Sequence, residues 1–234
     1  MQQIDFNRTV NYELVKYKMS PLDLLIFRGD SFISDFISET QERQLGSGDI
    51  SHVGMVVTAR ILDFYLDKNR KKVYLDPTKV YILESISKGV VIRPLKKVIE
   101  GYHKAGGEVG WAKLRKPELV TSFDFTKVFR KYHGLEYDLD VLDLSGGLYP
   151  WMRCLRNTRN KFLNFIYNKF LPNKKNPTNR QFCSELIANV LRDLNIISQE
   201  IEPQNVMPMD LLGYDQDNIK EAIYEDPVFF EKKN

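Results

Sequence analysis

Cysteine is scarce in this sequence: of its 234 residues only two, Cys154 and Cys183, are cysteines. Two cysteines cannot form the dense disulfide framework of a small secreted domain. Hydrophobic residues make up 43% of the chain, which is enough for a core that needs no such crosslinks. The cysteine content therefore favours a reducing compartment, cytoplasmic or otherwise intracellular.

Long hydrophobic runs are also missing. The apolar run that begins at Val53 is interrupted by Arg60 and Asp63, and no other stretch approaches the roughly 18 uncharged residues of a membrane span. The N-terminus lacks a basic start followed by an apolar segment, so no signal peptide is expected. We expect a protein that is soluble or bound to a membrane surface.

Neither sign of charge is in excess, since 34 basic and 31 acidic residues give a formal net charge of +3. This balance does not predict a nucleic-acid partner. His103 and His133 lack metal-ligand spacing to either cysteine, and the sequence contains no HExxH or CxxC motif and no glycine-rich phosphate loop. We therefore expect neither a metal nor a cofactor.

Hydrophobic patterning places strands in the middle of the chain and helices before and after them. It predicts strands at 22–27, 52–66, 72–85, 88–94 and 108–115, of which 52–66 and 72–85 form a long antiparallel hairpin. It predicts helices at 31–42, 95–102, 122–132, 155–171 and 179–195, a short one from Pro208, and an extended tail. Gly134 is expected to end the helix before it in a left-handed conformation.

This distribution predicts an α+β fold built on a central antiparallel sheet. Residues 1–234 form one expected domain, with a basic helical insertion at about 150–176 and a C-terminal tail from about 213.

Cys183 falls in the first turn of the helix predicted at 179–195. Unpaired backbone N–H groups and the positive end of the helix dipole favour a thiolate there, which lowers the cysteine pKa and makes the sulfur nucleophilic. Cys183 also shares helical spacing with Ile187, Val190 and Leu194, so a small buried hydrophobic residue is the alternative interpretation.

His52 and Glu84 stand at the two ends of the predicted hairpin. His52 opens one strand, and Gly54 leaves space beside its imidazole. Glu84 ends the other strand on an otherwise apolar face, where a carboxylate is costly without a partner. A hairpin centred on the polar tip places residue 84 near residue 52, although Pro77 could add a bulge. A structural histidine and a salt-bridged glutamate are the alternatives.

Carboxylate, imidazole and thiol are the three parts of an activated cysteine nucleophile, because the acid orients the base and the base takes the proton. Several short segments carry these residues in a recognisable order. They are Ser51-His52-Val53-Gly54, Leu83-Glu84-Ser85 followed by Gly89-Val90-Val91, Glu136-Tyr137-Asp138, Phe182-Cys183-Ser184-Glu185-Leu186, and a late Met207-Pro208-Met209-Asp210-Leu211. Together they resemble the circularly permuted papain-like hydrolases of the NlpC-like superfamily, in its YiiX-like branch, which has poxviral members. The resemblance covers about Leu22 to Leu212.

The resemblance implies a permuted papain-like fold in which the cysteine-bearing helix packs against the sheet and follows the histidine strand. By position it implies Cys183 as nucleophile, His52 as general base and Glu84 as the residue that orients the base. Tyr137 would border the groove and contact the substrate or the oxyanion; a core tyrosine is the alternative. The chain departs from these relatives at Leu22, where they usually have glycine before Asp23. A viral origin would add a virion location to the intracellular ones.

Residues 153–175 carry seven basic side chains and no acidic one, interleaved with apolar residues. A basic amphipathic helix of this kind can contact an anionic membrane surface or an acidic substrate. A core-packed helix with a solvated basic face is the alternative.

The sequence thus predicts a cysteine hydrolase of the thiol peptidase or amidase type. Cys183 would attack an amide, peptide or isopeptide bond and form a thioester acyl-enzyme. The first alternative is a lipid acyl hydrolase or acyltransferase similar to the lecithin:retinol acyltransferase group, which shares the permuted scaffold. The second is a non-catalytic binding protein on the same fold. The expected partner is accordingly a peptide, amide or lipid acyl substrate.

Overall fold

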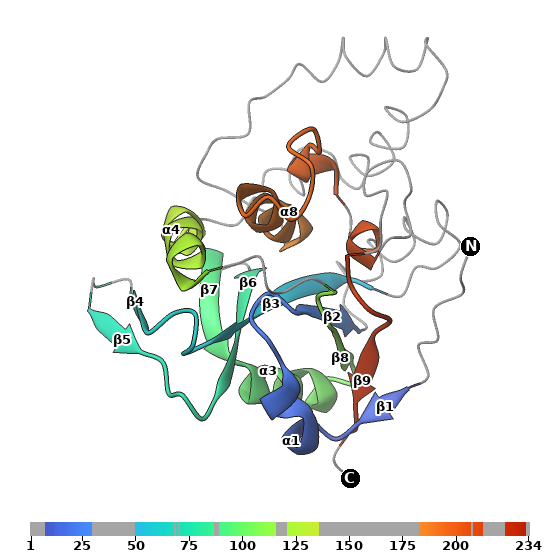
Figure 1. Ribbon diagram of the computed structural model, residues 1–234. Helices are drawn as coiled ribbons and strands as arrows, with labels where there is room; N and C mark the ends of the chain where they lie inside the picture. The colour runs from blue at the N-terminus through green and yellow to red at the C-terminus, as the bar shows by residue number, and fades with distance from the viewer. Residues whose placement is uncertain are drawn as a thin grey trace, which may run out of the picture.

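A seven-stranded mixed sheet forms the centre of the computed structural model (Figure 1). The structure describes residues 8–29, 50–67, 69, 71–86, 89–115, 121–135, 183–206, 208–212 and 223–232. The strand order is β1-β9-β8-β2-β3-β6-β7. The strands are β1 (Thr9–Val10), β2 (Leu24–Arg28), β3 (His52–Thr58), β6 (Val80–Ile86), β7 (Gly89–Pro94), β8 (Glu108–Ala112) and β9 (Val228–Phe230). The prediction of an antiparallel sheet needs one correction, because β1 pairs with β9 in parallel while the other neighbours are antiparallel.

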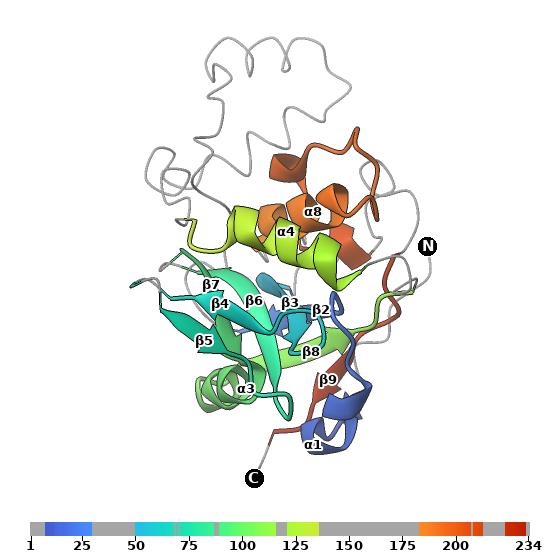
Figure 2. The same cartoon turned by 60° about the vertical axis from the view of Figure 1, so that its left-hand side comes forward.

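The predicted hairpin is present as the β3–β6 pair. Its tip forms a second, two-stranded sheet of β4 (Phe64–Leu66) and β5 (Lys72–Tyr74), which projects to one side in Figure 1 and comes forward in Figure 2. Met55 pairs with Leu83, so the residue level with Glu84 is Gly54 rather than His52. The register differs by two residues from a hairpin centred on the tip, and an even difference leaves every side chain on its predicted face.

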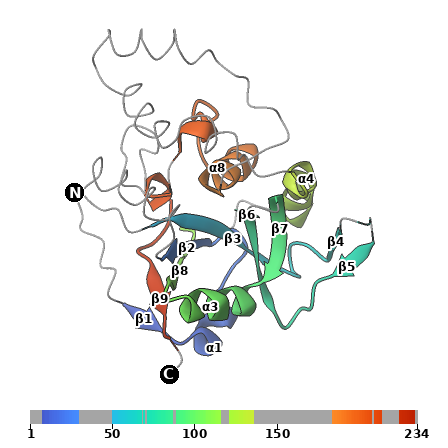
Figure 3. The same cartoon turned by 180° about the vertical axis from the view of Figure 1, so that it is seen from behind.

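Helices cover both faces of the sheet (Figures 1 and 3). One face carries α8 (Cys183–Asp193) and α4 (Ser122–Tyr132), and their apolar residues pack with Val53, Met55 and Leu83. The other carries α3 (Leu95–Lys104) and α1 (Tyr12–Val15), which pack with Val56 and other apolar residues. Short 3-10 turns complete the described chain at η1 (Lys16–Lys18), η3 (Pro203–Asn205) and η4 (Asp210–Leu212). None of the helices that these residues form has the length and hydropathy to cross a membrane.

Most predicted elements lie close to their expected positions. The helix predicted at 122–132 is confirmed as α4, and Thr121 caps it by accepting a hydrogen bond from the Asp124 N–H at 3.2 Å. Gly134 follows it with φ of 83°, as predicted. Strand β9 in the predicted tail was missed. The helices expected at 31–42 and 155–171 lie outside the described residues.

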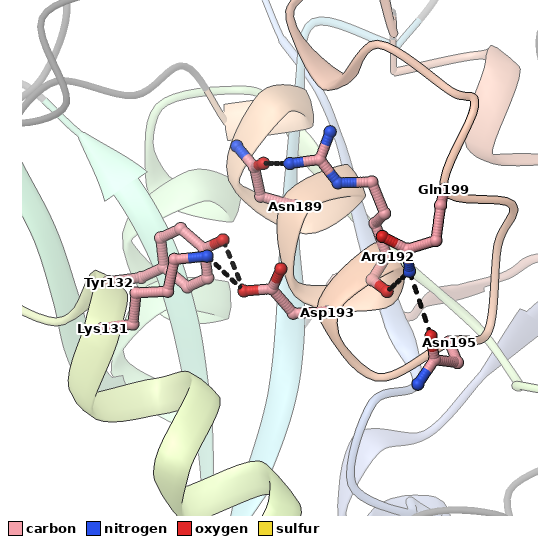
Figure 4. Close-up of polar contacts among 7 residues, drawn as sticks. All are labelled: Lys131, Tyr132, Asn189, Arg192, Asp193, Asn195 and Gln199. Atoms are coloured by element: carbon pink, nitrogen blue, oxygen red, sulfur yellow. Dashed lines mark hydrogen bonds and ion pairs between the residues drawn. The ribbon is translucent and has the colours of Figure 1, made fainter.

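The C-terminal end of α8 is tied to its surroundings by polar contacts (Figure 4). The Asp193 carboxylate accepts hydrogen bonds from the Lys131 Nζ and the Tyr132 hydroxyl of α4, both at 2.7 Å. In the loop that follows, the Gln199 side-chain amide donates to the Arg192 carbonyl at 2.6 Å and to Asn195 Oδ1 at 3.0 Å. The helix that begins with Cys183 is therefore anchored at its far end.

The turn before β2 keeps a left-handed backbone without glycine. Leu22 has φ of 72°, a region that costs a non-glycine residue about 1 to 2 kcal/mol. Its carbonyl accepts a hydrogen bond from the buried Tyr224 hydroxyl at 3.1 Å, and its N–H donates to the Val56 carbonyl at 3.0 Å. Buried Asp23 beside it accepts hydrogen bonds from the Trp111 indole at 2.8 Å and the Leu114 N–H at 3.0 Å. These contacts hold the turn in its strained form.

Candidate active site

Glu84 forms the centre of a polar cluster in three adjacent strands. Its side chain has no solvent exposure. Its Oε2 lies 3.0 Å from His52 Nε2 on β3. Its Oε1 accepts a hydrogen bond from Arg93 Nε on β7 at 2.7 Å and forms an ion pair with Arg93 Nη2 at 2.6 Å. Each carboxylate oxygen thus has its own partner, and these contacts offset the free-energy cost of burying the charge.

The strand register explains how these side chains converge. Glu84 is level with Gly54 on β3 and with Val91 on β7, so His52 and Arg93 reach it diagonally from two residues away. A Cβ atom at Gly54 would clash with the Ile82 side chain and lie 3.2 Å from the Leu83 carbonyl oxygen. Glycine is therefore needed for close approach of β6, and the space predicted beside the imidazole is occupied by Ile82.

Aromatic packing fixes the imidazole of His52. The centroid of the Phe27 ring lies 5.1 Å from that of the His52 ring. The centroid of the Tyr102 ring, on α3, lies 4.6 Å from that of Phe27. Because Nε2 contacts Glu84, Nδ1 is the ring nitrogen left to contact a further group. The Cys183 thiol is hydrogen-bonded to this imidazole.

Cys183 is the first residue of α8 and is 5% exposed. Besides its hydrogen bond to His52, its sulfur is hydrogen-bonded to the backbone N–H groups of Val53 and Ser184. The β3–β6 ladder begins at the Met55–Leu83 pair, so the Val53 N–H lies beyond it and is directed at sulfur instead. The thiol and the imidazole meet at this end of the sheet, although they start from opposite faces of it.

The surroundings of the cluster favour its charged forms. Burial alone would raise the pKa of the Cys183 thiol, but the His52 charge and hydrogen bond, together with the Val53 and Ser184 N–H groups, outweigh burial and lower the pKa. Burial alone would lower the pKa of His52, and the neighbouring Cys183 and Glu84 reverse that effect and raise it. The pKa of Glu84 is lowered, because His52 and Arg93 outweigh desolvation. A thiolate beside an imidazolium is the form that this arrangement stabilises.

Both interpretations of Cys183 describe part of its environment. It packs in the same core as Ile187 and Val190, as the helical spacing predicted. A buried structural cysteine needs no imidazole at its sulfur, however, and no carboxylate behind that imidazole. The arrangement has the order of an activated nucleophile, in which base and orienting acid follow the thiol.

Arg93 and Tyr102 belong to this region and were not identified from the sequence. A signal for Arg93 was available, since a carboxylate on an apolar face requires a partner and Arg93 shares that face on the next strand. Tyr102 carries no such signal, because only the fold brings α3 beneath β3. Tyr137, Cys154 and the basic stretch 153–175 lie outside the described residues.

No family model matches the chain, and no curated protein matches its sequence.

Proposed function

We propose that the protein is a cysteine hydrolase that cleaves an amide, peptide or isopeptide bond. One observation carries the proposal: the Cys183 thiol is hydrogen-bonded to His52, whose Nε2 lies 3.0 Å from the fully buried Glu84 carboxylate. Residues from β3, β6 and α8, far apart in sequence, converge in the order that nucleophilic catalysis needs. The same order along the chain supports the further proposal of a permuted papain-like fold.

In the proposed reaction the Cys183 thiolate attacks the carbonyl carbon, and the oxygen takes up the negative charge. When the intermediate collapses, the C–N bond breaks, the imidazolium of His52 protonates the leaving amine, and a thioester remains. Water then gives a proton to neutral His52 and attacks the thioester carbonyl, which releases the acid and restores the thiolate. Glu84 stays ionised throughout and holds the ring in position. No external cofactor is required for this sequence of steps.

The acyl donor is a separate question, because the chemistry at sulfur is the same for a peptide and for a lipid. The basic, aromatic-rich composition of 153–175 favours a lipid acyl hydrolase or acyltransferase as the second candidate. A peripheral contact with anionic membrane through this stretch would accompany that activity.

The test is to incubate the protein with a panel of peptide amides, an isopeptide and mixed phosphatidylcholine/phosphatidylserine vesicles, and to search by mass spectrometry for an acyl adduct on Cys183. We expect a thioester from an amide substrate, with release of the amine, and no adduct on Cys183→Ser. An adduct from phospholipid would support the second candidate instead. Absence of any adduct, together with a Cys183 that reacts with iodoacetamide like an ordinary thiol, would support the non-catalytic alternative.

A further inference from the structure

We propose that Arg93 is a positioning residue of the active site, which fixes the Glu84 carboxylate and balances the charge of the buried cluster. This inference rests on the proposed function, because it assigns Arg93 a role in generating the Cys183 thiolate. The sequence resemblance does not include Arg93.

The geometry separates the two oxygens of Glu84. Arg93 places both Nε and Nη2 on Oε1, at 2.7 Å and 2.6 Å, and among the residues that the structure describes Oε2 contacts His52 Nε2 at 3.0 Å. A carboxylate held by one side of a planar guanidinium cannot rotate about its terminal bond without losing both contacts. Arg93 therefore directs Oε2 at the imidazole and fixes the ring nitrogen that faces Cys183.

Charge balance gives Arg93 a second effect. Within the described part of the chain, the active form of the cluster contains two negative and two positive groups: the Cys183 thiolate and the Glu84 carboxylate, and the His52 imidazolium and the Arg93 guanidinium. Tyr102 faces the cluster from α3 and stays neutral, because burial and the nearby Glu84 and Cys183 charges raise its pKa to about 12. Without Arg93 the buried cluster carries one net negative charge, which favours protonation of the thiolate.

The Arg93 side chain contributes little to the packing of β7, since 41% of it is exposed. A purely structural arginine at this position would affect folding stability without altering how Cys183 titrates. The pH profile of the thiol therefore distinguishes the two roles.

The experiment measures the rate of iodoacetamide alkylation of Cys183 against pH, with peptide mass mapping to separate it from Cys154. For Arg93→Gln we expect the midpoint to rise by about 0.5 to 1 pH unit, because a nearby cation is lost. The midpoint for Arg93→Lys should rise less, since lysine restores the positive charge but not the two-nitrogen contact with Glu84. Lys131→Gln removes one positive charge from α4, where Lys131 pairs with Asp193, and should leave the midpoint unchanged.

A folded Arg93→Gln protein whose profile matches the wild type would overturn the role of Arg93. Were Arg93→Gln not to fold, Arg93→Lys would decide: a smaller upward shift supports the role, and a profile equal to the wild type overturns it. Failure of the proposed function gives a different result, in which the wild-type thiol reacts only above about pH 8 and His52→Ala leaves its profile unchanged. That result would overturn both proposals.

Discussion

Replacement of Glu84 by glutamine tests how the buried carboxylate controls the imidazole. The amide keeps the shape of the side chain but presents one acceptor and one donor group, where the carboxylate presented two acceptors. Arg93 directs two N–H groups at Oε1, so the amide oxygen will face Arg93 and the NH2 group will face His52. The NH2 group then needs an acceptor at His52 Nε2, which places the imidazole proton on Nδ1, toward Cys183.

Two magnitudes follow from this geometry. An opposite charge in direct contact shifts a pKa by roughly 1 to 3 units, so loss of the carboxylate should lower the pKa of His52 by about that much. The Cys183 thiolate then loses part of the imidazolium charge that stabilises it, and its alkylation midpoint should rise. This rise should be smaller than that for His52→Ala, because the ring remains. The free energy of unfolding should fall by about 1 to 3 kcal/mol, which is less than the roughly 3 to 5 kcal/mol for breaking a fully buried ion pair, since the Arg93 side chain is 41% exposed and can be solvated.

The pH dependence has a defined sign. The pKa of Glu84 in the folded protein lies below its ordinary value of 4.5. Its stabilising contribution is therefore complete above about pH 4.5 and is lost as the pH falls through the folded-state value. Urea denaturation of wild type and Glu84→Gln at pH 7 and pH 3 measures this, and the difference between the two proteins should shrink at pH 3.

Glu108→Gln provides the matched control, because Glu108 also pairs with a strand arginine, Arg28 at 3.3 Å, but is 41% exposed. It should change stability by less than about 1 kcal/mol and leave alkylation unchanged. The reasoning is refuted if Glu84→Gln alkylates like the wild type, or if Glu108→Gln shifts the profile equally.

Three further predictions concern the scaffold, each measured by urea denaturation. Gly54→Ala should destabilise the protein by about 1 to 3 kcal/mol, because the added Cβ clashes with Ile82. Gly101→Ala on α3 should instead stabilise it by up to about 1 kcal/mol, because a Cβ there meets nothing within 4 Å. Equal effects of the two substitutions would contradict the close approach of β6. Leu22→Gly should be at least as stable as Leu22→Ala, the reverse of the usual order, because φ is 72° there; a less stable glycine variant would argue against the left-handed turn. Tyr132→Phe should cost about 1 to 2 kcal/mol by removing the 2.7 Å hydrogen bond to Asp193, and it should leave Cys183 alkylation unaltered.

The sequence was most informative where local rules determine the structure. The strand at 88–94, the helix at 122–132 and the left-handed Gly134 follow from alternation, capping and glycine preference, and they appear as β7, α4 and φ of 83°. The face of Glu84 followed from the period of the strand, which a register difference of two residues does not change.

Features that depend on distant parts of the chain were not predicted. Strand β9 joins the sheet by pairing with β8 and β1, and nothing in the short Val228–Phe230 segment indicates those partners. The contact of Arg93 with Glu84 depends on the diagonal offset between two strands, which cannot be fixed without the register. The left-handed Leu22 is held by Tyr224, over 200 residues away, and overrides its own backbone preference.

The central claim is that His52 activates Cys183, and the most direct test is the pH profile of Cys183 alkylation in wild type and His52→Ala. Peptide mapping follows both cysteines, so Cys154 reports on the reagent in the same sample. A thiolate paired with imidazolium predicts reaction that persists below pH 7 in the wild type and moves toward the free-thiol value near pH 8.5 in His52→Ala. A wild-type thiol that reacts only above about pH 8, with a profile that His52→Ala does not change, would contradict the account.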